Sequence, residues 1–500
     1  MLVVLAICIV AVSLFYHHFA KYNNYWKERN VAGPEPTFFF GNIKDLALKR
    51  RSAIEVYTDI YDKYPNEKVL GIFRMRSPTL LVKDVEIIKH ILIKDFENFT
   101  DRDVDFAEEG IDANLFSFNG NTWRALRQHC TSIFTSRKLK NMMYLITERG
   151  DKLIDYIEKI SKEQPDQEVH GIVRKYTQGC ITSCAFGLDI DTFDSKFDIF
   201  EKLEPKIFST NYRLELEMMY PGILKRLKLS IGSQEVSDFF FRLTKDVISQ
   251  RNGNPSDRND FVDLMLSLRK AKQISFPVKG TDAETTVDIT DDIMAGMMFI
   301  FYAAGYQTSA LTMSYILHYL ARNPGIQEKV VTEIKQVLKK NEGKLTYEAV
   351  SNLKYMGQVF DETLRLHPVT DHLRRRALND YRVPGTDLTV KKGQIFIIPI
   401  PAVHMDPNNY PDPTVFDPDR FSPENVASRH SCAYLSFGLG PRHCIGWRFA
   451  QLQSRVGLVK LLSTFRVEPC SQSLKKFQYQ TSFLMTPKGG VKLNFTKRLH

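Results

Sequence analysis

The feature that most constrains this chain is the ten-residue segment 437–446, in which three glycines and one proline surround Cys444. This composition excludes a helix or the interior of a strand and predicts a tight loop. The residues that follow Gly446 have helical periodicity, so Cys444 is expected just before a helix N-terminus. The backbone N–H groups and the helix dipole at such a position favour a thiolate over a thiol.

A thiolate in a glycine loop suits a haem iron, because cysteine is one of its known axial ligands and Arg442 can lie against a haem propionate. The alternatives are a buried cysteine in a turn, or a zinc site made of His430, Cys432, His443 and Cys444. Adjacent His443 and Cys444 make an awkward pair for one tetrahedral metal, and no CxxC spacing supports zinc. The residues therefore favour haem.

The segment also resembles the haem-binding signature of the cytochrome P450 family, Phe-x-x-Gly-x-Arg-x-Cys-x-Gly, and matches it at every fixed position. The resemblance implies that Cys444 is the ligand of the iron in haem b. It also implies that Phe437 and Arg442 contact this cofactor.

Trp123 and Arg127 are four residues apart and share one face of a predicted helix. An indole N–H and a guanidinium suit a buried carboxylate, although the pair alone would indicate an amphipathic surface helix. The pair resembles the family's Trp-x-x-x-Arg motif, which implies that both residues bind haem propionates. The resemblance assigns the same role to Arg102 and to Arg375, which has an arginine on either side.

A long apolar helix is predicted from Asp291 to Asn323. The small side chains of Ala304 and Gly305 would let a flat macrocycle approach it, and Thr308 can bond back to a carbonyl and bend the axis. This stretch resembles the family's oxygen-activation motif, which implies that Thr308 passes protons toward dioxygen. Gln307 stands where the family usually has an acid, and since an amide cannot shuttle protons, delivery would run through Thr308 and water.

Glu362 and Arg365 are three residues apart and can form a pair on one helix face, which is usually a surface pair. The pair resembles the family's Glu-x-x-Arg motif. The resemblance implies a buried pair, completed by Arg420 from the proline-rich segment 406–421, that holds the cysteine loop in place.

The resemblance also locates the substrate pocket. Val369 and Thr370 would line it above the haem, together with Ala303 of the long helix. The segment 481–485, in a predicted C-terminal β region, would add a second wall through Phe483.

Residues 1–20 contain no charged side chain, and cationic residues follow from Lys21 onward. This length suffices to cross a bilayer, and the basic n-region and cleavage site of a signal peptide are not evident. We expect an uncleaved anchor with the body on the cytoplasmic side, a basic, proline-containing hinge at 21–36 and a catalytic domain at 37–500. Seven scattered cysteines agree with a reducing compartment.

The net charge of +10 is not concentrated in a tail, which argues against a nucleic-acid-binding arm and for a diffuse basic face. Lys138, Lys140 and Arg448 are candidates for binding an acidic reductase surface, with solvated surface residues as an equal alternative.

Apolar and basic residues alternate between Met218 and Leu229 around a Pro-Gly turn. The turn, with Ile223 and Leu224, is expected either to touch the membrane or to be an ordinary connection between helices.

Taken together, the motifs predict a mainly α protein with small β-sheets (α+β), in which one large helical haem domain of the cytochrome P450 fold follows an anchor. Details of the sequence resemble the insect microsomal branch associated with detoxification. The resemblance implies a monooxygenase of the endoplasmic reticulum membrane that hydroxylates or epoxidises lipophilic compounds such as plant toxins or insecticides. It would use dioxygen and electrons from NADPH through a flavin reductase, and a small b-type cytochrome is a further candidate partner.

Three other functions remain open at this point. The substrate could be an endogenous hormone or lipid. A haem-thiolate isomerase or lyase would need no proton delivery to dioxygen, so Thr308 argues against it. A non-catalytic haem protein on the same fold is the third.

Overall fold

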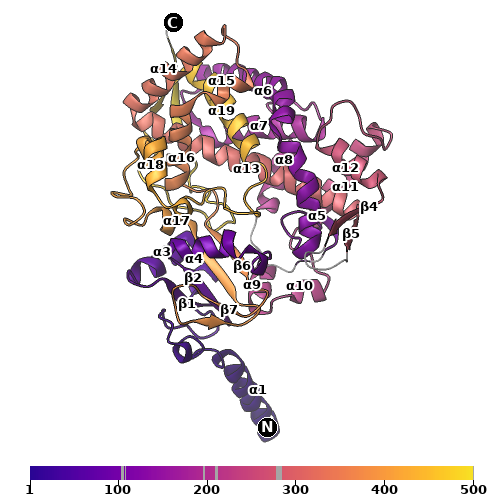
Figure 1. The fold of residues 1–500 in the computed structure, drawn as a ribbon, viewed down its shortest axis with the longest axis vertical. Helices are drawn as coiled ribbons and strands as arrows, with labels where there is room; N and C mark the ends of the chain where they lie inside the picture. Colours follow the sequence, from indigo (N-terminus) through magenta and orange to yellow (C-terminus); the bar gives the residue numbers. More distant parts are fainter. Residues whose placement is uncertain (103–105, 107, 195–197, 209–211, 278–283, 499–500) are drawn as a thin grey trace.

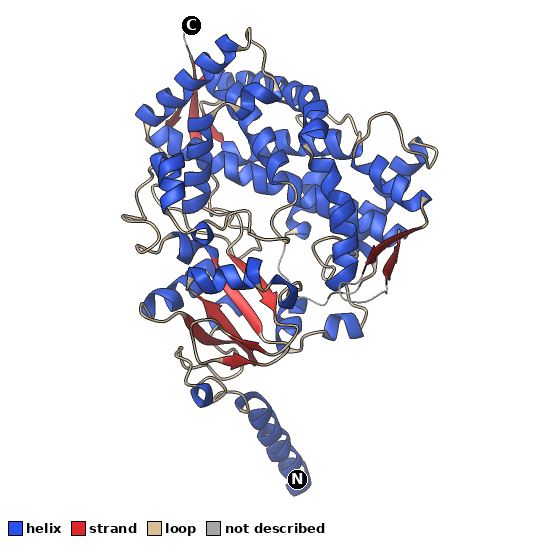
Figure 2. Ribbon diagram, viewed as in Figure 1, coloured by secondary structure: helices blue, strands red, loops and turns tan. Residues whose placement is uncertain are grey.

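The computed structural model describes residues 1–500 except 103–105, 107, 195–197, 209–211, 278–283 and 499–500. Helices make up most of the molecule, small sheets lie at its edges, and α1 projects from the end that carries the largest sheet (Figures 1 and 2). The predicted mainly helical α+β fold is confirmed.

The helices follow the apolar periodicity of the sequence. They are α1 (Leu2–Ala20), α2 (Lys44–Ala47), α3 (Ala53–Lys63), α4 (Val85–Lys89), α5 (Gly120–Thr131), α6 (Ser136–Glu163), α7 (Val169–Ile181), α8 (Asp198–Ile207), α9 (Tyr212–Met219), α10 (Ile223–Arg226), α11 (Gln234–Gln250), α12 (Phe261–Lys270), α13 (Asp291–Arg322), α14 (Pro324–Lys340), α15 (Tyr347–Ser351), α16 (Lys354–Leu366), α17 (Ile400–His404), α18 (Pro423–Ser428) and α19 (Trp447–Thr464).

The largest sheet has the strand order β1-β2-β9-β6. The antiparallel hairpin of β1 (Val69–Arg74) and β2 (Ser77–Val82) continues through β9 (Ile395–Pro399), which is parallel to β2, to β6 (His372–Arg376). The smaller sheets contain β3 (Asp166–Glu168), β10 (Phe465–Pro469) and β11 (Lys492–Lys497); β4 (Gln273–Pro277) and β5 (Glu284–Asp288); and β7 (Tyr381–Arg382) and β8 (Thr389–Val390).

Residues 481–485 lie in the C-terminal region that carries β10 and β11, as expected, but they are not a strand themselves. They form an irregular loop that is closed by a bridge between Tyr479 and Pro487.

Helix α13 runs through the helical core and is buried along most of its length. Its N-terminus is capped by Thr290, whose side chain accepts a hydrogen bond from the Ile293 N–H at 3.3 Å. It ends at Arg322, before Pro324, one residue earlier than predicted. Since its neighbours α7, α11 and α19 cover it, α13 is a rigid wall on which a site can be built.

The first helix, α1, is almost wholly exposed. Its segment Leu2–Phe19 has a mean hydropathy of 2.2, and within the ranges given above it is the one helix long and apolar enough to cross a membrane. Exposed apolar surface of this extent indicates an interaction with a membrane or a partner. Aromatic contacts of Phe19 with Phe38 and Phe39 join its C-terminal end to the body.

The turn between α9 and α10 contains Ile223 and Leu224, the two apolar residues considered for membrane contact. Leu224 is fully buried and packs against Phe106, so it does not face a membrane. The buried carboxylate of Glu217 accepts hydrogen bonds from the N–H groups of Gly222 (2.6 Å) and Leu224 (3.2 Å), which fixes the turn. The exposed apolar side chain here is Leu227.

Burial of His318 predicts an acid-sensitive fold. His318 lies on α13 against Phe477, with ring centroids 4.5 Å apart, and burial lowers its pKa to about 4. The unfolded chain therefore takes up a proton near the ordinary histidine pKa that the folded chain does not bind. The contribution of neutral His318 to the free energy of unfolding is fully present above pH 6.5 and is lost as the pH decreases toward 4. Between pH 7 and 5 this group should lower the free energy of unfolding by about 2 kcal/mol.

His318→Phe keeps an aromatic ring but removes the titrating group. Urea denaturation at pH 7, 6 and 5 should show a smaller loss of stability in this variant than in the unaltered protein. Parallel losses in the two proteins would contradict the assignment.

Candidate active site

The cysteine loop is fixed by its own backbone. The Cys444 N–H donates a hydrogen bond to the Phe437 carbonyl at 2.7 Å. Gly438 and Gly440 adopt positive φ of 67° and 69°, which disfavours other residues. A Cβ on Gly440 would also lie 1.8 Å from the Leu92 carbonyl oxygen. The predicted tight loop is thus present.

Cys444 lies just before α19, whose N-cap is Gly446. Its side chain is exposed to open space, yet burial of its surroundings raises the pKa of the thiol. The Gly446 N–H and the cations of Arg127 and Arg102 oppose this effect but do not overcome it. The location of Cys444 before a helix therefore does not by itself produce a thiolate, and a metal cation bound to the sulfur would be needed to stabilise the ionised form.

On α13, the face that carries Ala304 and Thr308 opens onto space. Ala304 is exposed although neighbouring Ala303 is buried, and the Thr308 hydroxyl donates to the Ala304 carbonyl at 2.7 Å. Gly305 points elsewhere, because a Cβ there would lie 2.6 Å from Ile181 of α7. The expectation that Gly305 admits a macrocycle is corrected: this glycine lets α13 pack closely on α7.

Gln307 is buried beside His170 of α7, a residue that sequence analysis missed. The Gln307 Oε1 atom has no hydrogen-bond partner within the described ranges. Burial lowers the pKa of His170 to about 4, while Glu168 and Gln307 act to raise it. His170 is therefore neutral at pH 7. No motif marks it, because its approach to Gln307 depends on how α7 crosses α13.

The four arginines predicted to bind propionates lie together near the cysteine loop. Each donates to a backbone carbonyl: Arg102 to Phe116 at 2.8 Å, Arg127 to His443 at 2.8 Å, Arg375 to Arg374 at 2.7 Å and Arg442 to Phe118 at 2.8 Å. The Arg442 guanidinium also lies 4.1 Å from the centre of the Trp123 ring. Trp123 and Arg127 thus come from one face of α5, as their spacing predicts.

These four side chains are here called the arginine cluster, and Asp101 opposes the lowering of the pKa of Arg442 without forming an ion pair with it. Among residues that the structure describes, none of them forms an ion pair with a carboxylate. Burial lowers the pKa of Arg375 to about 10, and burial with neighbouring Arg375 lowers that of Arg442 to about 9. Burial, together with four neighbouring arginines, also lowers the pKa of Arg102.

The cluster also carries buried N–H groups without acceptors, namely Nε of Arg375 and both Nε and Nη1 of Arg442. Buried cations of this kind are costly unless an anion pairs with them. The two carboxylates of a haem would supply that charge beside the accessible sulfur of Cys444, so the residues present fit haem.

Residues predicted for the substrate pocket come from three segments. The Val369 carbonyl accepts a hydrogen bond from the Met485 N–H at 2.9 Å, which ties the 481–485 loop to the segment after α16. Phe483 is 42% exposed and contacts Phe116 edge to face at 6.0 Å. Thr370 is half-buried.

Phe116 was not predicted as a site residue. Its ring also lies 4.3 Å below the Arg102 guanidinium, so it joins the arginine cluster to the pocket wall. The sequence signal that could have identified Phe116 is its spacing of two residues from Phe118 in an otherwise mostly polar loop.

Glu362, Arg365 and Arg420 meet behind the cysteine loop. Glu362 and Arg365 are completely buried and form a two-point pair of 2.7 and 2.8 Å. The Arg420 Nε lies 3.6 Å from Glu362. Burial raises the pKa of Glu362, and the two arginines oppose that rise, which keeps the carboxylate paired.

His404 links this pair to the loop and was also missed. Its Nε2 accepts the Leu435 N–H at 2.8 Å, so the proton must be on Nδ1, which lies 3.0 Å from the Arg365 carbonyl. Burial lowers the pKa of His404 to about 3 and keeps it neutral.

The zinc alternative is not supported. Within the described ranges, no group of three or more histidine, cysteine or acidic side chains could hold a metal ion. His430 instead lies 2.9 Å from Glu86.

An accessible thiol, an unpaired arginine cluster and a buried helix with one open face together define a site for an iron porphyrin. The family model for cytochrome P450 matches residues 31–495. The chain is 47% identical over 500 residues to cytochrome P450 6B1 of Papilio polyxenes, covering 100% of both chains, and 46% identical over 494 residues to cytochrome P450 6B2 of Helicoverpa armigera, covering 99% and 98%. It is 35% identical over 506 residues to cytochrome P450 6a2 of Drosophila melanogaster, covering 99% of each. The chain belongs to the cytochrome P450 family, in agreement with the insect branch that the sequence resembles.

Removing one member of the buried pair should destabilise the protein strongly. Glu362→Gln leaves the Arg365 charge buried without its partner, which costs about 3–5 kcal/mol. Urea denaturation and haem content should both show the loss. Glu342→Gln, which breaks an exposed pair with Lys344, is the control and should leave both unchanged. Equal behaviour of the two variants would contradict the structural role of Glu362.

The arginine cluster predicts opposite effects with and without haem. Arg375→Met removes a buried, unpaired charge, so the haem-free protein should gain about 1–3 kcal/mol in unfolding free energy. The same change should accelerate haem loss to a scavenger protein, because a propionate loses its partner. Exposed Arg382→Met should do neither. If haem-free Arg375→Met had a lower unfolding free energy than the haem-free unaltered protein, the buried charge of Arg375 would not be destabilising.

Proposed function

We propose that this protein is a membrane-anchored haem-thiolate monooxygenase that oxidises lipophilic small molecules, with foreign compounds such as plant toxins or insecticides as its substrates. The observation that carries this proposal is the accessible Cys444 thiol beside the arginine cluster. Membership of the family supports haem and oxygen chemistry, and resemblance to the insect detoxification branch supports the substrate class.

In this proposal Cys444 holds the iron, and Arg102, Arg127, Arg375 and Arg442 hold the propionates. Haem supplies oxygen activation and the transfer of one oxygen atom to substrate. The chain supplies the cysteine, which is held by a rigid loop, and the buried helix α13, which carries Thr308.

Thr308 is the proposed proton donor of the site. Its hydroxyl donates to the Ala304 carbonyl, so its oxygen is free to accept a hydrogen bond from water, and rotation of the hydroxyl would redirect its hydrogen toward the open face. Gln307 is neutral and buried beside His170 of α7, so it releases no proton to the site. In this proposal proton delivery runs through Thr308 and water.

We further propose that NADPH–cytochrome reductase supplies the electrons and that the endoplasmic reticulum is the location. The exposed helix α1 supports attachment to a membrane. Arg448 is exposed at the start of α19, next to the cysteine loop, and is the better placed of the predicted reductase contacts. Lys140 pairs with Glu348, and Lys138 donates to the Asn259 carbonyl at 3.0 Å.

Reconstitution of the full chain with reductase and phospholipid tests the function. A panel of lipophilic plant toxins and insecticides should yield oxygenated products that require both NADPH and dioxygen. Conversion of a peroxide without reductase, with no such products, would favour an isomerase or lyase.

Thr308 should control how much of the NADPH is used productively. Thr308→Ala should lower product formed per NADPH about tenfold while NADPH consumption continues, because proton delivery is lost but electron supply is not. Released hydrogen peroxide should account for the difference. Thr308→Ser keeps the hydroxyl and should recover most of the product. Unchanged coupling in Thr308→Ala would remove Thr308 from the mechanism.

Arg448 should affect reductase binding selectively. Arg448→Glu should slow the first electron transfer about three- to tenfold at low ionic strength, with the difference shrinking as salt rises. Stopped-flow reduction under carbon monoxide measures this step. Lys140→Glu should have a smaller effect, since Glu348 already neutralises Lys140. If Lys140→Glu slowed the first electron transfer more than Arg448→Glu, the reductase would bind on the side of Lys140 and not at Arg448.

A further inference from the structure

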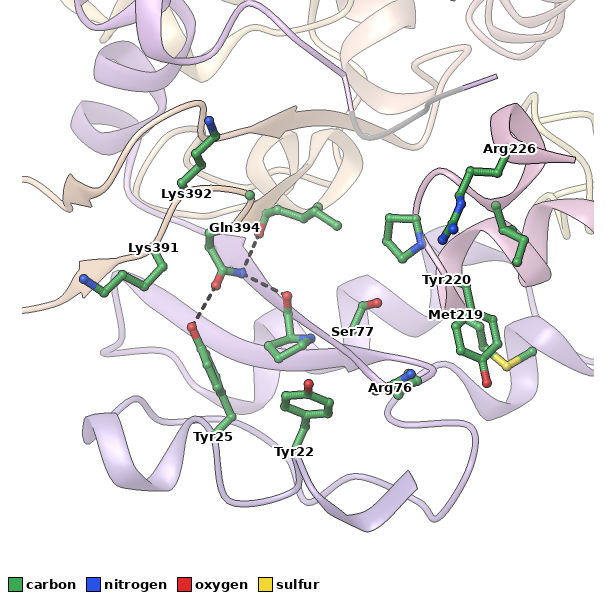
Figure 3. Close-up of a pocket in the computed structure, with 15 residues that line it drawn as sticks. Tyr22, Tyr25, Arg76, Ser77, Met219, Tyr220, Arg226, Lys391, Lys392 and Gln394 are labelled. Atoms are coloured by element: carbon green, nitrogen blue, oxygen red, sulfur yellow. Dashed lines mark hydrogen bonds between the residues drawn. The ribbon is translucent and has the colours of Figure 1, made fainter. Parts of the chain in front are cut away.

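A pocket of about 530 Å³ lies apart from the cysteine loop, where the C-terminal end of α1 joins the body (Figures 1 and 3). Four segments that are distant in sequence form it. They are the chain after α1, the β1–β2 turn, the α9–α10 turn and the segment that leads into β9, represented by Tyr22, Arg76, Tyr220 and Lys392. Figure 3 shows Tyr22, Arg76 and Tyr220 close together, with Lys391 and Lys392 at the other edge of the lining.

The lining of this pocket is cationic. It contains Arg76, Arg226, Lys391 and Lys392 and no acidic residue. Lys391 pairs with Asp380 at 2.6 Å, outside the lining. Arg226 and Lys392 form no side-chain ion pair with any residue that the structure describes. Several cations that line one pocket without an acidic residue in that lining create a positive potential that attracts an anion.

Tyrosines and a fixed amide complete the polar part of the pocket. Arg76 lies 5.2 Å from the ring centre of Tyr22 and 5.4 Å from that of Tyr220. Gln394 is held by hydrogen bonds to the Pro78 carbonyl at 2.9 Å and from the Tyr25 hydroxyl at 3.4 Å. These contacts hold the lining in place before any ligand binds, which lowers the entropic cost of binding.

The pocket is tied directly to the end of α1. His18, in the last turn of that helix, lies 3.2 Å from the Tyr220 hydroxyl and 2.8 Å from Arg76 Nη1. If the apolar segment Leu2–Phe19 crosses the bilayer, its last turn lies at the headgroup level. Arg76 and Tyr220 then lie at that same level, where tyrosines and basic residues are enriched.

We propose that this pocket binds the phosphate of an anionic phospholipid headgroup. The inference rests on α1 being a membrane anchor, but not on the oxygenase chemistry of Cys444. Arg226 of the α9–α10 turn and Lys392 of the segment that leads into β9 both line the pocket and would supply charge to the phosphate, while the apolar side chains of Met219 and Ile223 accompany the start of the acyl chains. The negative charge of the cytoplasmic leaflet matches this basic pocket. A lipid bound here would fix the body against the membrane beside its anchor.

Calorimetric titration of the full chain in dodecyl maltoside micelles tests the proposal, with dihexanoyl phosphatidic acid, dihexanoyl phosphatidylcholine and inorganic phosphate as separate probes. Phosphatidic acid should bind saturably at one site, and phosphatidylcholine and inorganic phosphate should each bind about tenfold more weakly or less. The double variant Arg226→Gln/Lys392→Gln should weaken phosphatidic acid binding about tenfold or more.

The control variant Lys339→Gln/Lys340→Gln removes two exposed charges at the end of α14, at the opposite end of the molecule (Figure 1), and should leave binding unchanged. Equal loss in the two double variants would mean that net charge, and not the pocket, attracts the lipid, which overturns the proposal. Binding of inorganic phosphate as tight as that of phosphatidic acid would assign the site to a free anion instead. Monooxygenase activity is not measured, so these outcomes are independent of the proposed function.

Discussion

The structure depends on an electrostatic imbalance at its centre. Arg102, Arg127, Arg375 and Arg442 are held near one another by backbone carbonyls, and no carboxylate of the described chain forms an ion pair with them. Such a cluster opposes folding unless an anion is built in. A haem would supply two carboxylates for the arginines and an iron for Cys444, so binding of this cofactor would remove the imbalance.

The chain surrounds this centre with two rigid supports. Behind the cysteine loop, the buried Glu362–Arg365 pair and neutral His404 connect α16 to the loop through hydrogen bonds of 2.7 to 3.0 Å. On the other side, α13 is fixed by close packing at Gly305 and presents Ala304 and Thr308. Rigid placement on both sides is what oxygen chemistry requires, since it must position a substrate and exclude water.

The sequence predicted features that reside in short patterns. Glycine spacing located the Cys444 loop, and helical spacing placed Trp123 with Arg127 and Glu362 with Arg365 on common faces. What it could not predict depends on packing between distant segments. Gly305 faces Ile181, Leu224 turns inward onto Phe106, and His170 reaches Gln307 across two helices. The spacing of residues along one element carries no information about which other element covers it.

The absorption spectrum of the reduced protein with carbon monoxide tests the central claim, that the Cys444 sulfur binds the haem iron, most directly. The account predicts the red-shifted Soret band of a thiolate-ligated adduct in the unaltered protein and its disappearance in Cys444→Ser, with haem still measurable in both. Survival of that band in Cys444→Ser, or its absence from unaltered protein that contains haem, would contradict the account.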